Sequence, residues 1–476
     1  MKKTLLSLIM ALFLGFSVFV TGCSCSDKGL RDNPPTDATV TSNGGMSVRK
    51  GDYLYFVNGY VDETTLGKKD NKEGEVTKGA IYRTKLDNGD ISKDKDGFLN
   101  NADRVVSKVV GFGNGGFYII DDYIVYATPY MGISKDGTLQ SNRVEFHRID
   151  INGTDDEVVF TTSQSEDNLD WTVTKVGSKV YLLVHEGEKI VSVNVTEDKV
   201  VATIDNVTSY AFFDNDEYIY SDARNYYNQS HVYYTREFLV EDNKYNYQGN
   251  VLCSFDITNG ESTSHILHEK NKYVIKHVNK DTLYYTYEKD EVSCLYKRNV
   301  INNFAESEEV QLSAIGYSEY TFLDYGVDMV LAKDDNGVWL LENGVNNTPK
   351  QVLTASRDIL GVFGDYGYYT SENSLIRFNV RTGELQDAYK SGKNTLITNS
   401  NYLDFDGRRV YLYVEYTAEN EDKNYYLNYF ESAYEGTDIE QRFVGVFENG
   451  DLPAKPEQPK EPEYEGDEIE YVPHID

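Results

Sequence analysis

A unit of about 51 residues recurs through most of this chain, and this repeat limits the possible folds more than any other feature. Each unit begins with a turn rich in Asp, Asn and Gly and continues into a short aromatic strand. After a variable insert comes a second strand, which often ends in an Asp-Gly or Asn-Gly turn. The turns begin near residues 51, 121, 177, 215, 280, 325, 365 and 406. This spacing is typical of a four-stranded propeller blade, which needs roughly 40–50 residues.

The predicted strands are apolar on both faces. In residues 53–57, Tyr53 and Tyr55 point to one side, while Leu54 and Phe56 point to the other. A blade between two neighbouring blades buries both faces, whereas a two-sheet sandwich would leave one face in water. No long segment has the 3.6-residue period that a helical solenoid requires. We therefore predict an all-β fold, a β-propeller of seven or eight four-stranded blades, over residues 47–449.

The repeat also resembles a known group of propeller repeats. The first unit contains Gly51-Asp52-Tyr53-Leu54-Tyr55-Phe56, then Ile81-Tyr82-Arg83 and the turn Asp87-Asn88-Gly89. It is similar to repeats of secreted and lipid-anchored Bacillota proteins, including the DUF5050-like family. In that family a Gly-Asp-x-Ile-Tyr-Tyr strand precedes a Leu-Tyr-Arg strand and an Asp-Gly turn. The resemblance covers residues 47–449 and implies the propeller architecture, but fold alone implies no activity.

The N-terminus has the order of a secretion signal with a lipid-attachment site. Two lysines precede an apolar run over residues 5–20, which is shorter than the roughly 20 residues of a spanning helix. A small Thr-Gly pair then leads into Cys23. This resembles a bacterial lipoprotein, which implies a signal peptide over residues 1–22 and a diacylglyceryl group with palmitate on Cys23. Two acyl chains would anchor the protein at the cell membrane on its extracytoplasmic face. An ordinary signal peptide cleaved nearby is the alternative.

Two segments outside the repeat lack the apolar residues that a folded core needs. Residues 23–46 contain Pro34 and Pro35 together with Ser, Thr and Gly, which predicts a flexible tether. Residues 450–476 are acidic, with proline at every third position from Pro453 to Pro462. This composition predicts a disordered acidic Pro-rich tail, and a docking segment for a partner is the alternative.

The acidic charge and the few cysteines exclude some classes of function. The chain carries a net charge of −32, and residues 1–22 hold two lysines and no acid, so the cleaved chain would carry −34. Such a surface repels nucleic acid, so we expect no nucleic-acid partner. Cys253 and Cys294 lie far from the N-terminus in short strand-like contexts. They predict buried core thiols, and a disulfide or a metal pair is the alternative.

Several motifs with a known chemistry fit plain structural roles better. Residues 111–116 match G-x-G-x-x-G but lead into a strand-like segment, whereas a dinucleotide site needs a helix there. His265 and His268 have H-x-x-H spacing, but on a strand they would point to opposite faces. Residues 94–97 and 334–337 could offer oxygens to Ca²⁺ but lack the other ligands of a calcium loop. We expect no metal and no cofactor.

The fourth unit contains the longest aromatic and polar insert, between strands expected at residues 216–220 and 251–257. Tyr and Asn together suit sugar or peptide recognition, because rings stack and amides form hydrogen bonds. The predicted binding residues are Tyr226, Tyr227, Tyr233, Tyr234, Tyr245 and Tyr247. The alternative is a long hairpin whose tyrosines cover the edge of a blade.

The chain has no G-x-S-x-G, P-loop or H-E-x-x-H motif, and we name no catalytic residue. We expect a lipid-anchored, non-catalytic binding or scaffold module for a protein or a glycan. Inserts at residues 58–79, 128–143 and 221–250 would surround one mouth of the ring. The alternative is a propeller enzyme that acts on polysaccharide or peptidoglycan through channel carboxylates. Two channel carboxylates about 5–10 Å apart would favour that enzyme.

Overall fold

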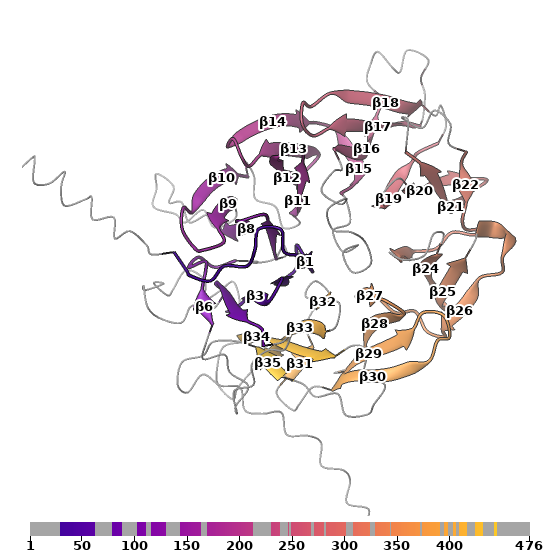
Figure 1. Cartoon of the computed structure of the whole chain (residues 1–476). Helices are drawn as coiled ribbons and strands as arrows, with labels where there is room; N and C mark the ends of the chain where they lie inside the picture. The colour runs from indigo at the N-terminus through magenta and orange to yellow at the C-terminus, as the bar shows by residue number, and fades with distance from the viewer. Residues whose placement is uncertain are drawn as a thin grey trace, which may run out of the picture.

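The computed structural model is built almost entirely of antiparallel strands arranged in a ring (Figure 1). Among the described residues the helical content is one short 3-10 helix, η5 (Gly344–Asn346). The structure describes residues 29–61, 79–87, 102–110, 116–129, 143–162, 169–212, 230–238, 246, 249–267, 271–279, 282–300, 308–323, 329–342, 344–371, 374–390, 395–397, 403–405, 409–416, 424–431 and 442–444.

Seven blades follow one another along the chain from β1 to β30, and a further sheet stands between the last blade and the first. The first blade has five strands: β1 (Val40–Thr41), β2 (Ser47–Lys50), β3 (Tyr53–Val57), β5 (Ile81–Lys85) and β6 (Asp103–Arg104). The second blade has four: β7 (Phe117–Ile120), β8 (Tyr123–Pro129), β9 (Val144–Asp150) and β10 (Glu157–Thr161). The predicted all-β propeller of seven or eight blades is therefore confirmed.

The next five blades each have four described strands that pair in chain order. The third and fourth blades are β11 (Asp170–Val176), β12 (Lys179–Glu186), β13 (Lys189–Asn194), β14 (Lys199–Ile204), and β15 (Val207–Ala211), β16 (His231–Glu237), β17 (Asn250–Asp256), β18 (Ser262–Leu267). The fifth to seventh are β19 (Val274–Asn279), β20 (Thr282–Lys289), β21 (Val292–Asn299), β22 (Val310–Gln311), then β23 (Glu319–Phe322), β24 (Met329–Asp334), β25 (Gly337–Glu342), β26 (Lys350–Leu353), and β27 (Gly361–Phe363), β28 (Tyr366–Ser371), β29 (Ser374–Asn379), β30 (Leu385–Lys390).

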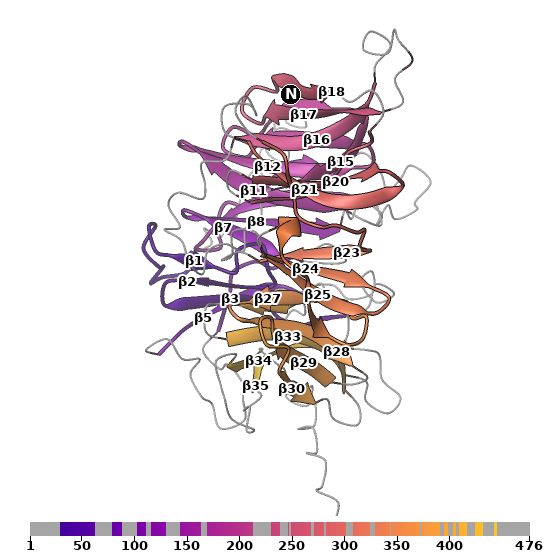
Figure 2. The same ribbon diagram turned by 90° about the vertical axis from the view of Figure 1, so that its right-hand side faces the viewer.

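The last sheet, which we call the closing sheet, joins the two ends of the ring. It contains β31 (Thr395–Ile397), β32 (Leu403–Phe405), β33 (Arg409–Tyr416), β34 (Asn424–Glu431) and β35 (Arg442–Val444). Its sixth strand, β4 (Tyr60–Val61), comes from the first blade's part of the chain and pairs with β34. Tyr411 of β33 is buried in the hydrophobic core of the first blade. Figure 2 shows the ring from the side, with β33 and β34 next to the first blade.

The middle strands are buried on both faces because each lies between two neighbouring blades. All five residues of β3 are buried. In β16, Tyr233 packs in a cluster with Tyr273 and Ile275 of the fifth-blade region. Its neighbour Tyr234 packs in a different cluster, with Tyr181 and Leu183 of the third blade. Alternate residues of one strand thus contribute to the cores on its two sides, as the period of two in a strand requires.

Two buried asparagines connect neighbouring parts of the ring. Each side-chain amide forms the pair of backbone hydrogen bonds that a neighbouring strand would otherwise form. The amide of Asn43 accepts from Ile119 N at 2.7 Å and donates to Ile119 O at 3.1 Å, which ties it to β7. Asn250, at the start of β17, does the same with Tyr273, at 2.8 and 2.9 Å. Each side chain satisfies one buried backbone donor and one buried acceptor that a strand would otherwise satisfy.

The structure corrects the predicted boundary between the flexible tether and the propeller at residue 47. Residues 23–28 of the expected tether lie outside the described residues, but residues 29–46 pack between the first and second blades; we call them the N-terminal arm. The arm starts with a hydrogen bond from Leu30 N to Asn152 O at 2.7 Å and includes the short strand β1. Prolines in this segment favour an extended backbone but do not prevent it from binding to a sheet edge.

The arm covers two buried cations of the first blade. Arg83 donates to Arg31 O at 2.7 Å and to the side-chain oxygen of Asn33 at 2.6 Å. Lys50 donates to Thr36 O of the arm at 2.8 Å and to Asp121 O of the second blade at 2.7 Å. A buried cation without such acceptors would be costly, so these contacts make the arm part of the folded body.

We expect Asn43→Ala and Asn250→Ala each to lower the free energy of unfolding by about 2–4 kcal/mol, because each leaves a buried N–H and C=O of a neighbouring segment unpaired. Urea denaturation followed by tyrosine fluorescence measures the change. Asn346→Ala is the matched control, since Asn346 is exposed in η5 and should change stability by less than about 0.5 kcal/mol. Equal stabilities for all three variants would refute the bridging role.

Candidate functional site

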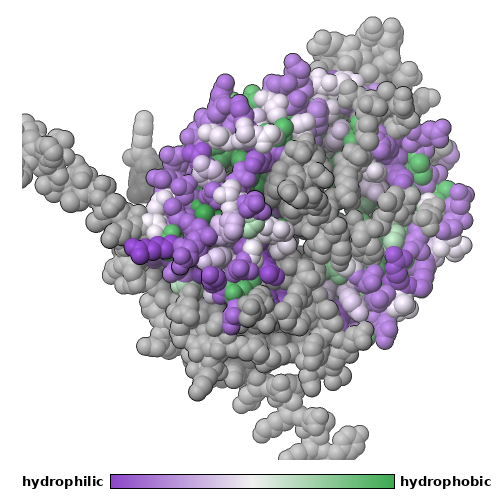
Figure 3. Space-filling view, viewed as in Figure 1, coloured by the Kyte–Doolittle hydropathy of each residue, from purple (hydrophilic) through white to green (hydrophobic). Residues whose placement is uncertain are grey.

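The first strands of the blades lie closest to the centre of the ring (Figure 1). Two of them carry or adjoin half-buried aromatic side chains. Tyr210 of β15 and the adjoining Phe212 are half-buried, as are Tyr320 and Phe322 of β23. By contrast, the first strand of the second blade, β7, is fully buried. The outer strands on the face in Figure 3 are mainly hydrophilic, with single apolar residues between polar ones. Among the described residues, the inner strands of the fourth and sixth blades therefore carry the half-buried aromatic side chains of the ring's centre.

One row of stacked rings crosses from the third blade to the fourth; we call His185, Tyr210 and Phe212 the aromatic row. The rings of His185 and Tyr210 stack with centroids 4.2 Å apart and planes 28° apart. Tyr210 and Phe212 have centroids 5.0 Å apart at 53°. His185 pairs with Asp170 across β12 and β11, so the strand register places this carboxylate beside the row.

The hydroxyl of Tyr210 is fixed by that carboxylate. It donates to Asp170 Oδ2 at 2.9 Å. Burial and the nearby Asp170 charge raise the pKa of Tyr210 well above its usual value, so the phenol stays protonated and remains a donor. The arrangement combines ring surfaces with a carboxylate that retains acceptor capacity, because an ionised carboxylate has about four lone-pair sites. It can bind by stacking and hydrogen bonding, and it holds no activated nucleophile.

The acidic residues on the first strands from β7 to β27 are bound to other side chains of the protein. The first strands of the blades from β7 to β27 contain two acidic residues in total. They are Asp170 of β11 and Glu319 of β23. Asp170 accepts from Tyr210, and Glu319 forms an ion pair with Lys333 at 2.6 Å. Within these described strands, each of the two carboxylates is therefore engaged by a protein partner of its own.

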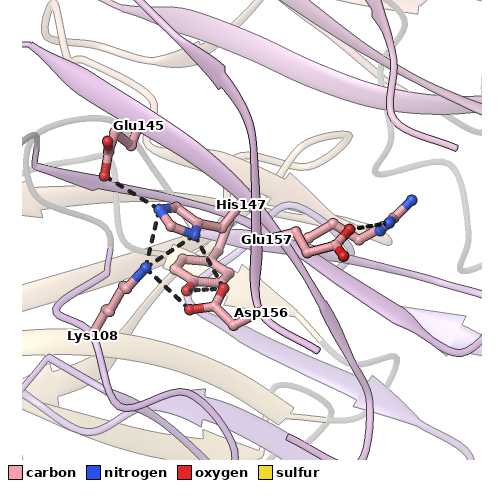
Figure 4. Close-up of polar contacts among 7 residues, drawn as sticks. Lys108, Glu145, His147, Asp156 and Glu157 are labelled. Atoms are coloured by element: carbon pink, nitrogen blue, oxygen red, sulfur yellow. Dashed lines mark hydrogen bonds and ion pairs between the residues drawn. The ribbon is translucent and has the colours of Figure 1, made fainter. Parts of the chain in front are cut away.

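A second polar cluster lies in the second blade and centres on His147 (Figure 4). His147 of β9 is only 1% exposed and stacks on the ring of Tyr126, with centroids 5.2 Å apart. Its Nδ1 lies 3.0 Å from Asp156 Oδ1, and its Nε2 lies 3.4 Å from Glu145 Oε2. Lys108 Nζ lies 3.1 Å from His147 Nδ1 and 3.1 Å from Asp156 Oδ2.

The charged and polar groups of this cluster bind one another within the fold. Burial alone would raise the pKa of Asp156, but hydrogen bonds from His147 and Tyr126 outweigh it and lower the pKa to about 2. Burial and the Asp156 charge raise the pKa of Tyr126, which donates to Asp156 at 2.8 Å. Because the imidazole is buried, it has no open face for a substrate. Lys108 comes from the segment between β6 and β7, so the cluster fastens the link between the first two blades.

Two of the six tyrosines predicted to bind a ligand lie among the described residues. The structure places both of them differently from the prediction. The second strand of the fourth blade is β16, not the segment expected at residues 216–220, which lies outside the described residues. Tyr233 and Tyr234 therefore fall within a central strand, where they are 9% and 3% exposed and pack against neighbouring blades. Their rings therefore form part of the blade cores and not an exposed surface. Tyr226, Tyr227, Tyr245 and Tyr247 lie outside the described residues, as does Cys23.

The other motifs have structural roles where they are described. Cys253 and Cys294 are buried thiols that form no disulfide, as predicted, and burial raises the pKa of Cys253. Gly116, the last residue of the glycine-rich motif, precedes strand β7, and a Cβ there would meet the arm's Gly45 O at 1.6 Å. His265 lies on β18, with Nε2 2.6 Å from Ser254 Oγ, whereas His268 lies outside the described residues.

Of the two acidic turns, residues 94–97 lie outside the described part, and Asp334 belongs to a hairpin turn. Its Oδ1 accepts from Asn336 N, Gly337 N and Trp339 Nε1 at 2.8–3.0 Å. These donors occupy the oxygen that a cation would need. No group of three or more metal-ligating side chains occurs among the described residues. Within the same part of the chain, no helix has the length and apolar character to cross a bilayer.

No family model matches the chain, and no curated protein matches it. Solved structures with a similar fold include Porphyromonas gingivalis dipeptidyl peptidase 4, at 12% identity and TM-score 0.44, covering 87% of this chain and 62% of that one. A prolyl endopeptidase has 11% identity and TM-score 0.41, covering 84% and 56%. The Vibrio parahaemolyticus oligogalacturonate lyase has 8% identity and TM-score 0.38, covering 67% and 88%. The chain spans about half to three fifths of the two peptidases, and likeness at this level carries no argument about activity.

The fold and the two clusters define the protein's class as a β-propeller of tyrosine-rich blades. Sequence reasoning missed the His147 cluster because its members come from three separate segments with no common motif. It also missed the aromatic row, although part of the row can be recognised in the sequence. The segment Tyr210-Ala211-Phe212 alternates aromatic and small residues just before an insert, which is typical of a strand that reaches a surface.

For Asp156 we expect a pH-dependent contribution to stability. Its folded pKa of about 2 lies below the unfolded value, so the stabilisation is complete above about pH 4 and is lost as the pH falls towards 2. Asp156→Asn should lower the free energy of unfolding at pH 7 by about 2 kcal/mol and remove this part of the acid dependence. Denaturation from pH 7 to pH 2 measures it. Glu157→Gln is the control, because Glu157 is exposed and its pair with Arg148 is worth little. An unchanged pH profile in Asp156→Asn would contradict the assignment.

Proposed function

We propose that this chain is a lipid-anchored, extracytoplasmic β-propeller that binds a protein or a glycan without catalysis. The propeller is the observed part of this statement. The anchor rests on the order of the lysines, the apolar run and Cys23 in the sequence. The binding role rests chiefly on one observation, the aromatic row beside Asp170 at the junction of the third and fourth blades.

The chemistry of the row supports recognition by stacking. Tyrosine and similar rings supply large contact area with few torsions to restrict, and a nearby carboxylate accepts hydrogen bonds from hydroxyl or amine groups. Because the whole chain carries a net charge of −32, its surface disfavours anionic ligands. The fitting ligands are thus a neutral or amino-sugar glycan, or a protein segment with hydroxyl, amide or basic side chains.

The enzyme hypothesis receives no specific support from the described residues. It needs two carboxylates at a set separation, one to act as acid and one as base or nucleophile. The two acidic residues on the inner strands from β7 to β27 have separate protein partners. His147, the imidazole with the most polar neighbours, is buried within the second blade. We therefore prefer binding over catalysis.

We expect Tyr210→Ala to weaken ligand binding at least about tenfold, because a central aromatic contact carries a large share of binding energy. The soluble body, from residue 29 onward, is applied to an array of neutral and amino-sugar glycans that includes peptidoglycan fragments, and is crosslinked to envelope proteins in parallel. Tyr210→Phe keeps the ring and should retain most binding. Thermal unfolding of both variants separates lost binding from lost folding.

Tyr123→Ala is the matched control for that experiment, since Tyr123 is exposed on β8 and lies outside the aromatic row. It should bind like the unchanged protein. If Tyr210→Ala folds normally and binds every glycan and protein as the unchanged chain does, the row is not the binding site. Turnover of a peptidoglycan or polysaccharide probe would instead favour the enzyme.

Cys23→Ser should release the chain from the membrane, because it removes the thiol that carries the acyl chains. Cells grown with labelled palmitate should incorporate the label into the unchanged chain and not into Cys23→Ser. Cys25→Ser is the matched control and should keep both label and membrane association. Label in Cys23→Ser, or its continued fractionation with membranes, would contradict the anchor.

A further inference from the structure

The N-terminal arm fixes the start of the folded chain at one side of the ring. The arm's first hydrogen bond, from Leu30 N to Asn152 O, lies at the turn between β9 and β10 of the second blade. Gly29 is packed as well, since a Cβ there would meet the side chain of Asn152 at 2.8 Å. The chain is therefore held on the body from residue 29.

Further contacts keep the arm in this place along its length. Gly51 N donates to Thr39 O at 2.9 Å, and Gly44 N donates to Phe117 O at 2.9 Å. Asn43 is 2% exposed and Met46 is 1% exposed. With Arg83 and Lys50 also bound to arm oxygens, detachment would expose two buried cations and several backbone groups.

The reach of the remaining chain is short. Six residue steps separate Cys23 from Gly29, and a chain spans at most about 3.6 Å per residue, so this reach is about 22 Å. Strands in a sheet lie about 4.8 Å apart, so two four-stranded blades across the ring place their outer strands more than about 29 Å apart. In Figure 1 the second blade lies at the left of the ring and the fifth blade at the upper right. A lipid on Cys23 can therefore hold the second blade's edge near the bilayer while the fifth blade's edge stays away.

We propose that the arm orients the propeller edge-on, with the outer edge of the second blade towards the lipid surface and the fifth blade away from it. This rests on the proposed lipid anchor at Cys23. The acidic charge favours the same orientation, because a ring that lies flat brings more of its acidic surface near an anionic bilayer. The central surface of the ring then remains open to a partner in the extracytoplasmic space.

Two exposed valines on equivalent outer strands provide the test. Val158 of β10 is 49% exposed in the second blade, and Val310 of β22 is 41% exposed in the fifth. The full lipidated chain carries Cys25→Ser with either Val158→Cys or Val310→Cys, and a fluorophore is attached to the new thiol. Cys253 and Cys294 are buried and stay unlabelled in the folded protein. The protein is placed in vesicles that contain a lipid with a nitroxide-labelled headgroup.

The fluorophore at position 158 should be quenched at least about twofold more than the one at position 310. Inserting 20 Gly/Ser residues after residue 28 adds a span of roughly 25 Å and should remove most of this difference. Equal quenching at the two positions, or stronger quenching at 310, overturns the orientation. Failure of the unlabelled chain to float with vesicles overturns the anchor itself, and the orientation with it. A difference that survives the long spacer also overturns the role of the arm.

Discussion

The structure depends on burial of both faces of each blade by its neighbours. Tyr233 and Tyr234 show this within one strand, since they belong to the cores on opposite sides of β16. A blade alone would expose one apolar face at each side, so stability comes from the complete ring. Closure is therefore the step on which the fold depends. It is made by β4 pairing with β34 and by Tyr411 entering the first blade's core.

The same constraint accounts for where polar groups are buried. At two places where neighbouring segments meet without a regular strand pair, the side chains of Asn43 and Asn250 supply the missing hydrogen bonds. Two buried cations at these junctions donate hydrogen bonds to backbone oxygens, Arg83 to the arm and Lys50 to the arm and to Asp121. The His147 cluster fastens the link between the first two blades with charged groups. These groups belong to the architecture.

The sequence predicted the architecture because few folds bury both faces of a short strand such as Tyr53-Leu54-Tyr55-Phe56 in every repeat. It also predicted the buried state of Cys253 and Cys294. It failed for Tyr233 and Tyr234 because an aromatic strand and an aromatic loop have the same composition, and here the neighbouring blades decide. It failed for the arm because residues 29–46 bind through backbone atoms and a few side chains, which composition does not reveal. The His147 cluster and the aromatic row depend on strand register, which one sequence does not contain.

Hydrogen–deuterium exchange followed by mass spectrometry tests the central claim most directly. If the ring is stabilised as one unit closed by the arm and the last sheet, the backbone amides of residues 40–57, of β8 and of β33 should exchange in one slow class. When residues 29–46 are removed, the remaining amides of that class, from residue 47 onward, should all exchange faster. Exchange of residues 40–57 and β33 within seconds, while β8, β12 and β20 stay protected, would contradict a ring whose blades are stable only together.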